Sequence, residues 1–105
     1  MGDIIKFGGE RKPFDPTNYK VVKEIVKKLW DKGLTRFTYH ARKRMAEKNR
    51  ETTDIQYIIY YGTIVEHSHP GDFWRFKLEG KTVDDDLLAC VVEIENKLVI
   101  ITIID

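Results

Sequence analysis

Three side chains of this 105-residue chain have the chemistry that cleavage of a phosphodiester requires. His40 and Arg44 stand four residues apart in a segment with helical spacing, so they share one row of a helix. Cleavage of RNA by its own 2′-hydroxyl needs an acid or base near neutrality and cations on the phosphate. An imidazole titrates at about pH 6.5, and a guanidinium offers paired donors. We therefore consider His40 as the base or acid, with Arg44 and Arg75 as phosphate ligands.

Each of these residues also has a structural interpretation. His40 would fix the start of its helix by bonding to the backbone, or would pair with an acid such as Glu47. Arg44 would form an ion pair with an acid of the sheet. Arg75 lies on a strand beside an aromatic residue and Lys77, an arrangement typical of surfaces that stack bases and hold a nucleic-acid backbone. The sequence leaves both interpretations open.

The charge of the chain is sorted along its length. Residues 20–50 hold eleven Lys and Arg against three acids, whereas residues 51–105 hold four against eleven. A helical face with this density of cations attracts polyanions over about one Debye length, roughly 8 to 10 Å. The residues that we expect to contact nucleic acid are Arg36, Tyr39, Arg42, Lys43 and Lys77. The alternative is a solvated helix surface.

Composition restricts the class of protein. With 42% hydrophobic and 33% charged residues, the chain has the composition of one soluble globular domain. Cys90 lies in an apolar run and is interpreted as a small buried hydrophobe. His67 and His69 could share a strand face, but two ligands do not make a zinc site. The longest apolar runs are well short of the roughly 18 residues of a membrane span, so we expect a cytoplasmic protein without membrane, metal or cofactor.

Hydrophobic spacing then predicts the elements that would position these residues. Three helices are expected in the first half of the chain, at residues 15–33, 39–48 and 53–61. Asp15 is placed to cap the first helix, and Thr53 with Gln56 forms a capping box for the third. Gly33 and Gly62 stand where helices commonly end.

After the third helix the period changes from 3.6 to 2. Four strands are expected, at residues 64–69, 73–79, 87–95 and 98–104. They form two antiparallel hairpins, and the last strand is apolar on both faces, which places it inside the sheet. The predicted fold is α+β, with N-terminal helices packed on one face of a four-stranded antiparallel sheet. Residues 1–14 form an irregular arm or a short added strand, and residues 15–105 form the single domain.

The order of these motifs resembles a known family. The second helix reads His-Ala-x-x-Arg-Met from His40, and it is followed by Gly62, an aromatic strand that holds Arg75 and ends in Gly80, and a terminal Ile-Thr-Ile strand. Over residues 36–104 this resembles a bacterial family of small domains of unknown function, distantly similar to RelE and BrnT toxins. The resemblance implies a RelE-like fold and a metal-independent ribonuclease. Both candidate arginines match family positions.

Three hypotheses follow for the function. The first is an endoribonuclease toxin that acts on RNA, free or on the ribosome, and is held inactive by a small antitoxin protein. The second is a module without catalysis, whose basic helix face binds nucleic acid or an acidic protein. The third is a structural subunit. A homodimer through an open sheet edge is compatible with each of them, and His67 or His69 is a further candidate for proton transfer.

Overall fold

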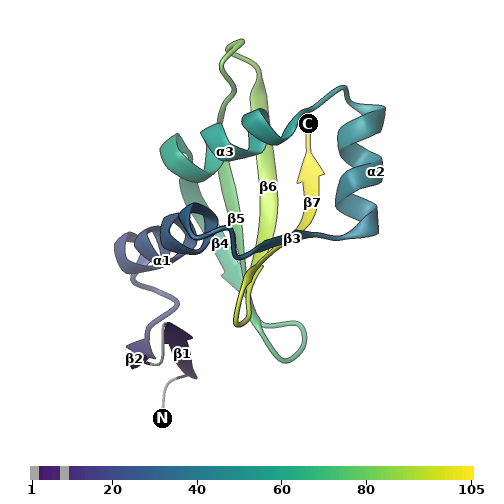
Figure 1. The fold of residues 1–105 in the computed structure, drawn as a ribbon. Coiled ribbons are helices and arrows are strands. Elements are labelled where there is room, and N and C mark those ends of the chain that lie inside the picture. The colour runs from purple at the N-terminus through teal and green to yellow at the C-terminus, as the bar shows by residue number, and fades with distance from the viewer. Residues whose placement is uncertain (1–2, 8–9) are drawn as a thin grey trace.

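The computed structural model describes residues 3–7 and 10–105, and their backbone forms helices and strands in an α+β arrangement (Figure 1). The helices are α1 (Tyr19–Asp31), α2 (Tyr39–Glu47) and α3 (Thr52–Tyr61). The strands are β1 (Asp3–Phe7), β2 (Glu10–Phe14), β3 (Thr35–Phe37), β4 (Thr63–Ser68), β5 (Trp74–Lys81), β6 (Leu87–Ile94) and β7 (Leu98–Ile104). The predicted α+β class is confirmed.

The main sheet differs from the prediction in one strand. It has five strands in the order β3-β7-β6-β5-β4, and β3 runs parallel to β7 while the other neighbours are antiparallel. The expectation of four antiparallel strands is therefore wrong. Because β3 has only three residues, it is too short to show a period of two. β7 lies between β3 and β6, which confirms that the last strand is internal.

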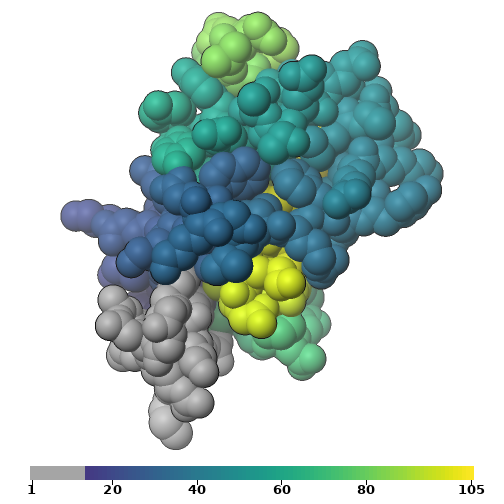
Figure 2. Space-filling model, in the orientation of Figure 1, coloured from purple at the N-terminus to yellow at the C-terminus, as the bar shows by residue number. Residues whose placement is uncertain are grey.

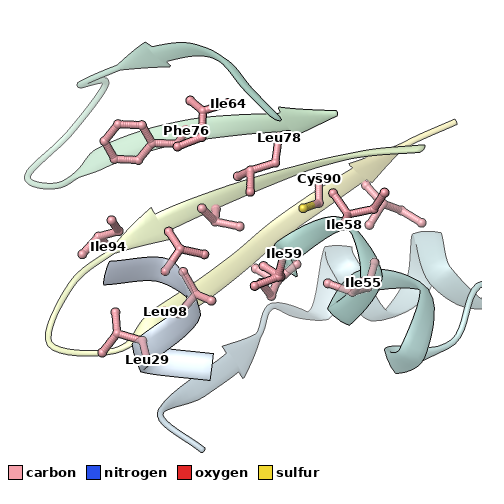
Figure 3. Close-up of a cluster of buried hydrophobic side chains, with 14 of the residues drawn as sticks. Leu29, Ile55, Ile58, Ile59, Ile64, Phe76, Leu78, Cys90, Ile94 and Leu98 are labelled. Carbon is pink, nitrogen blue, oxygen red and sulfur yellow. The ribbon is translucent and has the colours of Figure 1, made fainter. Parts of the chain in front are cut away.

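The hydrophobic core lies between the sheet and the helices. α1 and α3 cover one face of the sheet (Figure 1), and the space-filling view shows the helices closing over that face (Figure 2). Phe76 and Leu78 of β5 are fully buried on this side; Phe76 lies beside Ile64, and Leu78 lies nearer Cys90 and the α3 side chains (Figure 3). Cys90 is buried among them, and burial raises the pKa of its thiol to about 12. Its interpretation as a small core residue is confirmed.

α2 has a different position from the other helices. It lies beside β7 (Figure 1), along the part of that strand that the short β3 does not pair. Ala41 and Met45 of α2 are buried in the same core, as their spacing predicted. The helix thereby covers a sheet edge that would otherwise expose unpaired backbone groups.

Two helix starts differ from the predicted ones. α1 begins after Asn18, whose side chain accepts from the Val21 N–H at 3.3 Å, while Asp15 accepts from Thr17 in a turn. α3 begins after Glu51, which forms a capping box with Asp54. Both predictions were wrong because several polar residues near each start can cap, and sequence spacing does not decide between them. The predicted end of α1 is confirmed, since Gly33 has a φ of +73°.

Gly62 and Gly80 allow a close approach between α3 and β5. A Cβ atom on Gly62 would lie 2.5 Å from the Ile58 carbonyl oxygen and 2.9 Å from that of Glu79. A Cβ atom on Gly80 would lie 3.1 Å from the Cα of Gly62. The end of α3 therefore packs directly on the backbone of β5, which explains why glycine stands at both positions.

The N-terminal segment forms a separate hairpin. β1 and β2 pair with each other and not with the main sheet (Figure 1). Phe14 at the end of β2 is buried. Its ring meets that of Phe76 edge to face, and the ring centres are 5.9 Å apart. Of the arm that we predicted at residues 1–14, residues 1–2 and 8–9 lie outside the described residues.

Candidate nucleic-acid interface

Contacts with β7 fix the start of α2. Thr38 is the N-cap, and its hydroxyl accepts from the Ala41 N–H at 3.0 Å and donates to the Ile101 carbonyl oxygen at 2.8 Å. The Thr38 N–H donates to the Ile100 carbonyl oxygen at 3.1 Å. The first turn of the helix is therefore attached to the sheet on its inner side, so its outer side chains have a rigid support.

Three of the predicted nucleic-acid-binding residues lie together on the outer side of α2. Tyr39, Arg42 and Lys43 are spaced i, i+3 and i+4, which places them on one side of the helix, away from the core. Tyr39 is 83% exposed. Arg42 and Lys43 are exposed too, and no ion pair engages either of them within the described residues. We call this group of three residues the α2 surface.

The other two predicted binding residues lie elsewhere. Lys77 is on β5, on the sheet face that α1 and α3 leave uncovered, where its Nζ lies 3.6 Å from Glu79 Oε2. Arg36 is on β3 and pairs in register with Val99. Its charge acts on Glu95, whose pKa is raised chiefly by burial and by its neighbour Glu93. Lys77 therefore lies near an acid of its own strand, Arg36 lies near Glu95 in the turn after β6, and neither belongs to the α2 surface.

The structure brings two of the three predicted catalytic residues together. His40 is exposed and Arg44 is half-buried, and both lie on the flank of α2 that faces away from Arg42, since successive helical residues are about 100° apart. Neither residue makes an ion pair in the part of the chain that the structure describes. The structural interpretations that paired His40 with Glu47, or Arg44 with a sheet acid, are therefore not realised there.

Arg75 is separated from that pair. It lies on β5, while α2 contacts β7, so two strand spacings of about 4.8 Å each stand between them. Its Nε donates to Glu93 Oε2 at 2.5 Å on the uncovered face of the sheet. The guanidinium of Arg75 is thus paired with an acid of the next strand and does not converge with His40 and Arg44 on one point.

The two histidines of β4 and the following turn belong to a packed cluster. A bulge after Ile64 shifts the register so that His67 stands opposite Phe76 and faces α1. The His67 Nδ1 and the Tyr19 hydroxyl are 2.7 Å apart, and the rings of His67 and His69 lie 5.7 and 4.6 Å from that of Trp74. No group of three or more potential metal ligands occurs among the described residues. Sequence spacing did not reveal the bulge or the Tyr19 contact.

Several cations that the sequence left unassigned have a structural role. Lys23 of α1 donates to the Tyr60 carbonyl oxygen at 3.4 Å and to that of Gly62, at the end of α3. The Lys27 Nζ lies 5.8 Å from the centre of the Tyr60 ring. The Arg50 guanidinium, with only 13% of its side chain exposed, contacts Asp105 at 3.1 Å and Asp86 at 3.4 Å. Their partners are distant in sequence, so local spacing carried no signal for them.

Comparisons with known proteins complete the description. A family model described as Domain of unknown function (DUF4258) matches residues 37–105, from the end of β3 to the C-terminus. The match includes α2, α3 and β4 to β7, and it leaves α1 and the N-terminal hairpin outside. Comparison with curated proteins finds no match, and comparison with solved structures finds none either. In the part of the chain that the structure describes, no helix is both long enough and apolar enough to cross a membrane.

Proposed function

Because this chain belongs to the DUF4258 family of domains of unknown function, we propose its function from its own surface chemistry. The protein is a nucleic-acid-binding module, and its α2 surface holds the phosphodiester backbone. The observation that carries this proposal is the combination of an exposed tyrosine with two exposed cations that form no ion pair with a described acid. The same three residues were candidates from the sequence alone.

The charge of the α2 surface supports a phosphate ligand. An arginine or lysine that already pairs with a carboxylate must lose that partner before it can bind a phosphate. Arg42 and Lys43 have no such pair among the described residues, whereas Lys77 and Arg75 do. Contact of phosphates with Arg42 and Lys43 releases counterions from the nucleic acid, which is a principal source of affinity in such complexes.

The exposed ring of Tyr39 supports a base ligand beside the phosphate. An aromatic side chain buries about 150 to 250 Å² when it packs, so leaving its ring in water forgoes a large stabilisation. A base that stacks on such a ring contributes about 1 to 3 kcal/mol. Tyr39 stands one turn before Arg42 and Lys43, so a base and its neighbouring phosphates would be bound by a single helix.

A pair of double variants tests this proposal. Arg42→Ala with Lys43→Ala removes two charges from α2, and Lys20→Ala with Lys28→Ala removes two exposed charges from α1. We expect the α2 double variant to lose more than about ten-fold in affinity for single-stranded RNA, measured by fluorescence anisotropy, because two phosphate contacts disappear. The α1 double variant should stay within about three-fold. Equal losses in both variants would contradict the proposal.

A second candidate function is the metal-independent ribonuclease toxin with a RelE-like fold and an antitoxin partner. The observation in its favour is that His40 is exposed directly beside Tyr39, with Arg44 four residues further along α2. In this version, RNA held by the α2 surface would present a ribose to the His40 imidazole. The ion-paired Arg75 would have no part in the reaction.

Cleavage assays separate the two candidates. Labelled RNA is incubated with the protein in EDTA, and its integrity is followed on a gel. A ribonuclease gives products that disappear with His40→Ala while RNA affinity stays within about two-fold, since one exposed imidazole contributes little to backbone binding. Intact RNA at saturating wild-type protein would eliminate the ribonuclease and leave the binding module.

A further inference from the structure

A groove lies between α2 and the start of α3, directly beside the α2 surface. Its volume is about 500 Å³, within the range of roughly 300 to 1,000 Å³ that is typical of small-ligand sites. Phe37 and Met45 line it with apolar surface. Arg42 lines it as well, so one residue belongs to both the groove and the α2 surface, and the two sites are continuous.

The polar lining of this groove is arranged by the fold. The guanidinium of Arg50 is held by Asp105 and Asp86, so its position is fixed before any ligand binds. On the α3 side, Thr52 presents a hydroxyl that can donate and accept. Glu51 adds a carboxylate at the same end of the groove, which accepts hydrogen bonds. The groove thus combines apolar walls with guanidinium, hydroxyl and carboxylate groups.

This combination matches the two parts of a nucleobase. The face of a base is apolar and polarisable, and it packs on aromatic and thioether side chains such as Phe37 and Met45. The edge of a base carries carbonyl oxygens and ring nitrogens, which accept from guanidinium and hydroxyl donors. A folded peptide or a lipid chain has no such alternation of flat apolar faces and polar edges.

We propose that the groove between α2 and α3 receives one unstacked base of a single-stranded nucleic acid whose backbone lies on the α2 surface. This inference rests on the proposed function and names its substrate class. Bases of a duplex are stacked inside the double helix, and a base must leave the stack to enter a protein pocket. The groove therefore selects single strands over duplexes of equal charge.

Filling the groove tests this selection while both cations of the α2 surface remain. Ala46 is exposed on α2 and lines the groove, so Ala46→Tyr places a ring inside it. Gln56 is exposed on α3 and does not line this groove, so Gln56→Tyr is the matched control. Binding is measured for a 12-nucleotide single-stranded RNA and for a duplex with the same number of phosphates.

We expect the wild type to bind the single strand about ten-fold more tightly than the duplex, because only the single strand can place a base in the groove and gain its stacking energy. Ala46→Tyr should remove this preference by weakening single-strand binding alone, and Gln56→Tyr should preserve it. Equal binding of both RNAs by the wild type, or an unchanged preference in Ala46→Tyr, overturns the groove assignment but leaves the α2 surface in place. Failure of the wild type to bind either RNA overturns the proposed function itself.

A measurement on the wild type covers the case in which Ala46→Tyr does not fold. RNA that contains 4-thiouridine is bound to the protein and irradiated, and the cross-linked residues are identified by mass spectrometry. The groove assignment predicts cross-links at Met45 or Thr52. Cross-links at Tyr39 without any at those two residues would overturn the groove assignment and support backbone binding alone.

Discussion

α1 and α2 are both rich in cations, yet the fold uses their charges differently. On α1, Lys23 donates to carbonyl oxygens at the end of α3, and Lys27 lies over the ring of Tyr60. On α2, Arg42 and Lys43 have no ion pair among the described residues, and Tyr39 is exposed beside them. The difference shows that a count of cations does not identify a phosphate-binding surface, because a cation that already interacts with the fold is less available to a phosphate.

The position of each helix explains this difference. α1 packs against α3 over the sheet. Lysines at the border between its buried and exposed faces therefore lie against another helix. α2 packs beside β7 and leaves its outer side in solvent. Variants that alter one region at a time therefore separate the structural cations from the binding ones.

Gly62→Ala should have the largest effect, and it acts where α3 is anchored. A Cβ atom there would meet two backbone carbonyl oxygens at 2.5 and 2.9 Å, so the end of α3 must move away from β5. We expect the free energy of unfolding, measured by urea denaturation, to fall by about 3 kcal/mol. Gly71→Ala is the matched control, since nothing lies within 4 Å of its Cβ position. An equal loss in both variants would contradict the close packing.

Tyr39→Ala should have the next largest effect, but on affinity. Loss of a stacking ring should lower affinity for single-stranded RNA by about ten-fold. Stability should change by less than about 0.5 kcal/mol, because the ring is already exposed. Tyr61→Ala is the control, since that tyrosine is 72% exposed on α3 and touches Tyr57. If the two variants lost equal affinity, the tyrosine of the α2 surface would have no specific role in RNA binding.

Lys23→Met should lower stability and leave RNA affinity unchanged. The methionine keeps most of the apolar stem but removes the ammonium that binds two carbonyl oxygens at the end of α3. We expect about 1 kcal/mol less stability at neutral pH by thermal or urea unfolding. Lys28→Met, at an exposed position, provides the comparison. A drop in RNA affinity for Lys23→Met alone would assign a binding role to α1.

Lys23 also gives a small dependence of stability on pH. Its pKa lies below the ordinary 10.5, chiefly because of burial and also because of the nearby Lys27 charge. Between the lowered pKa and 10.5 the unfolded chain therefore binds more protons at this amine than the folded chain, so stability rises with pH. The free energy of unfolding of the wild type, relative to Lys23→Met, should increase as the pH approaches 10.5. A flat difference would mean that the pKa is not lowered.

Local patterns predicted most of the fold and only part of the candidate site. Helical spacing placed Ala41 and Met45 in the core, and the structure leaves Tyr39, Arg42 and Lys43 exposed on the other side of the helix. Alternation predicted four strands of the sheet, because each is long enough to show a period of two. β3 was not predicted, because three residues are too few to show a period of two.

Long-range partners account for what the sequence did not reveal. Arg75 was predicted to join His40 and Arg44, but it pairs with Glu93, its neighbour on β6. Likewise, the fixed position of Arg50 depends on two acids that lie 36 and 55 residues further along the chain. Such contacts depend on strand register and on the tertiary fold, and neither can be read from composition or periodicity.

Chemical-shift mapping locates the RNA-binding surface residue by residue. The protein labelled with ¹⁵N is titrated with a short single-stranded RNA while its backbone amides are followed. We expect shifts concentrated in residues 39–48, with the α1 amides of residues 20–31 unchanged. Shifts that fall mainly on α1 or on the uncovered face of the sheet, or no shifts at all at millimolar RNA, would contradict it.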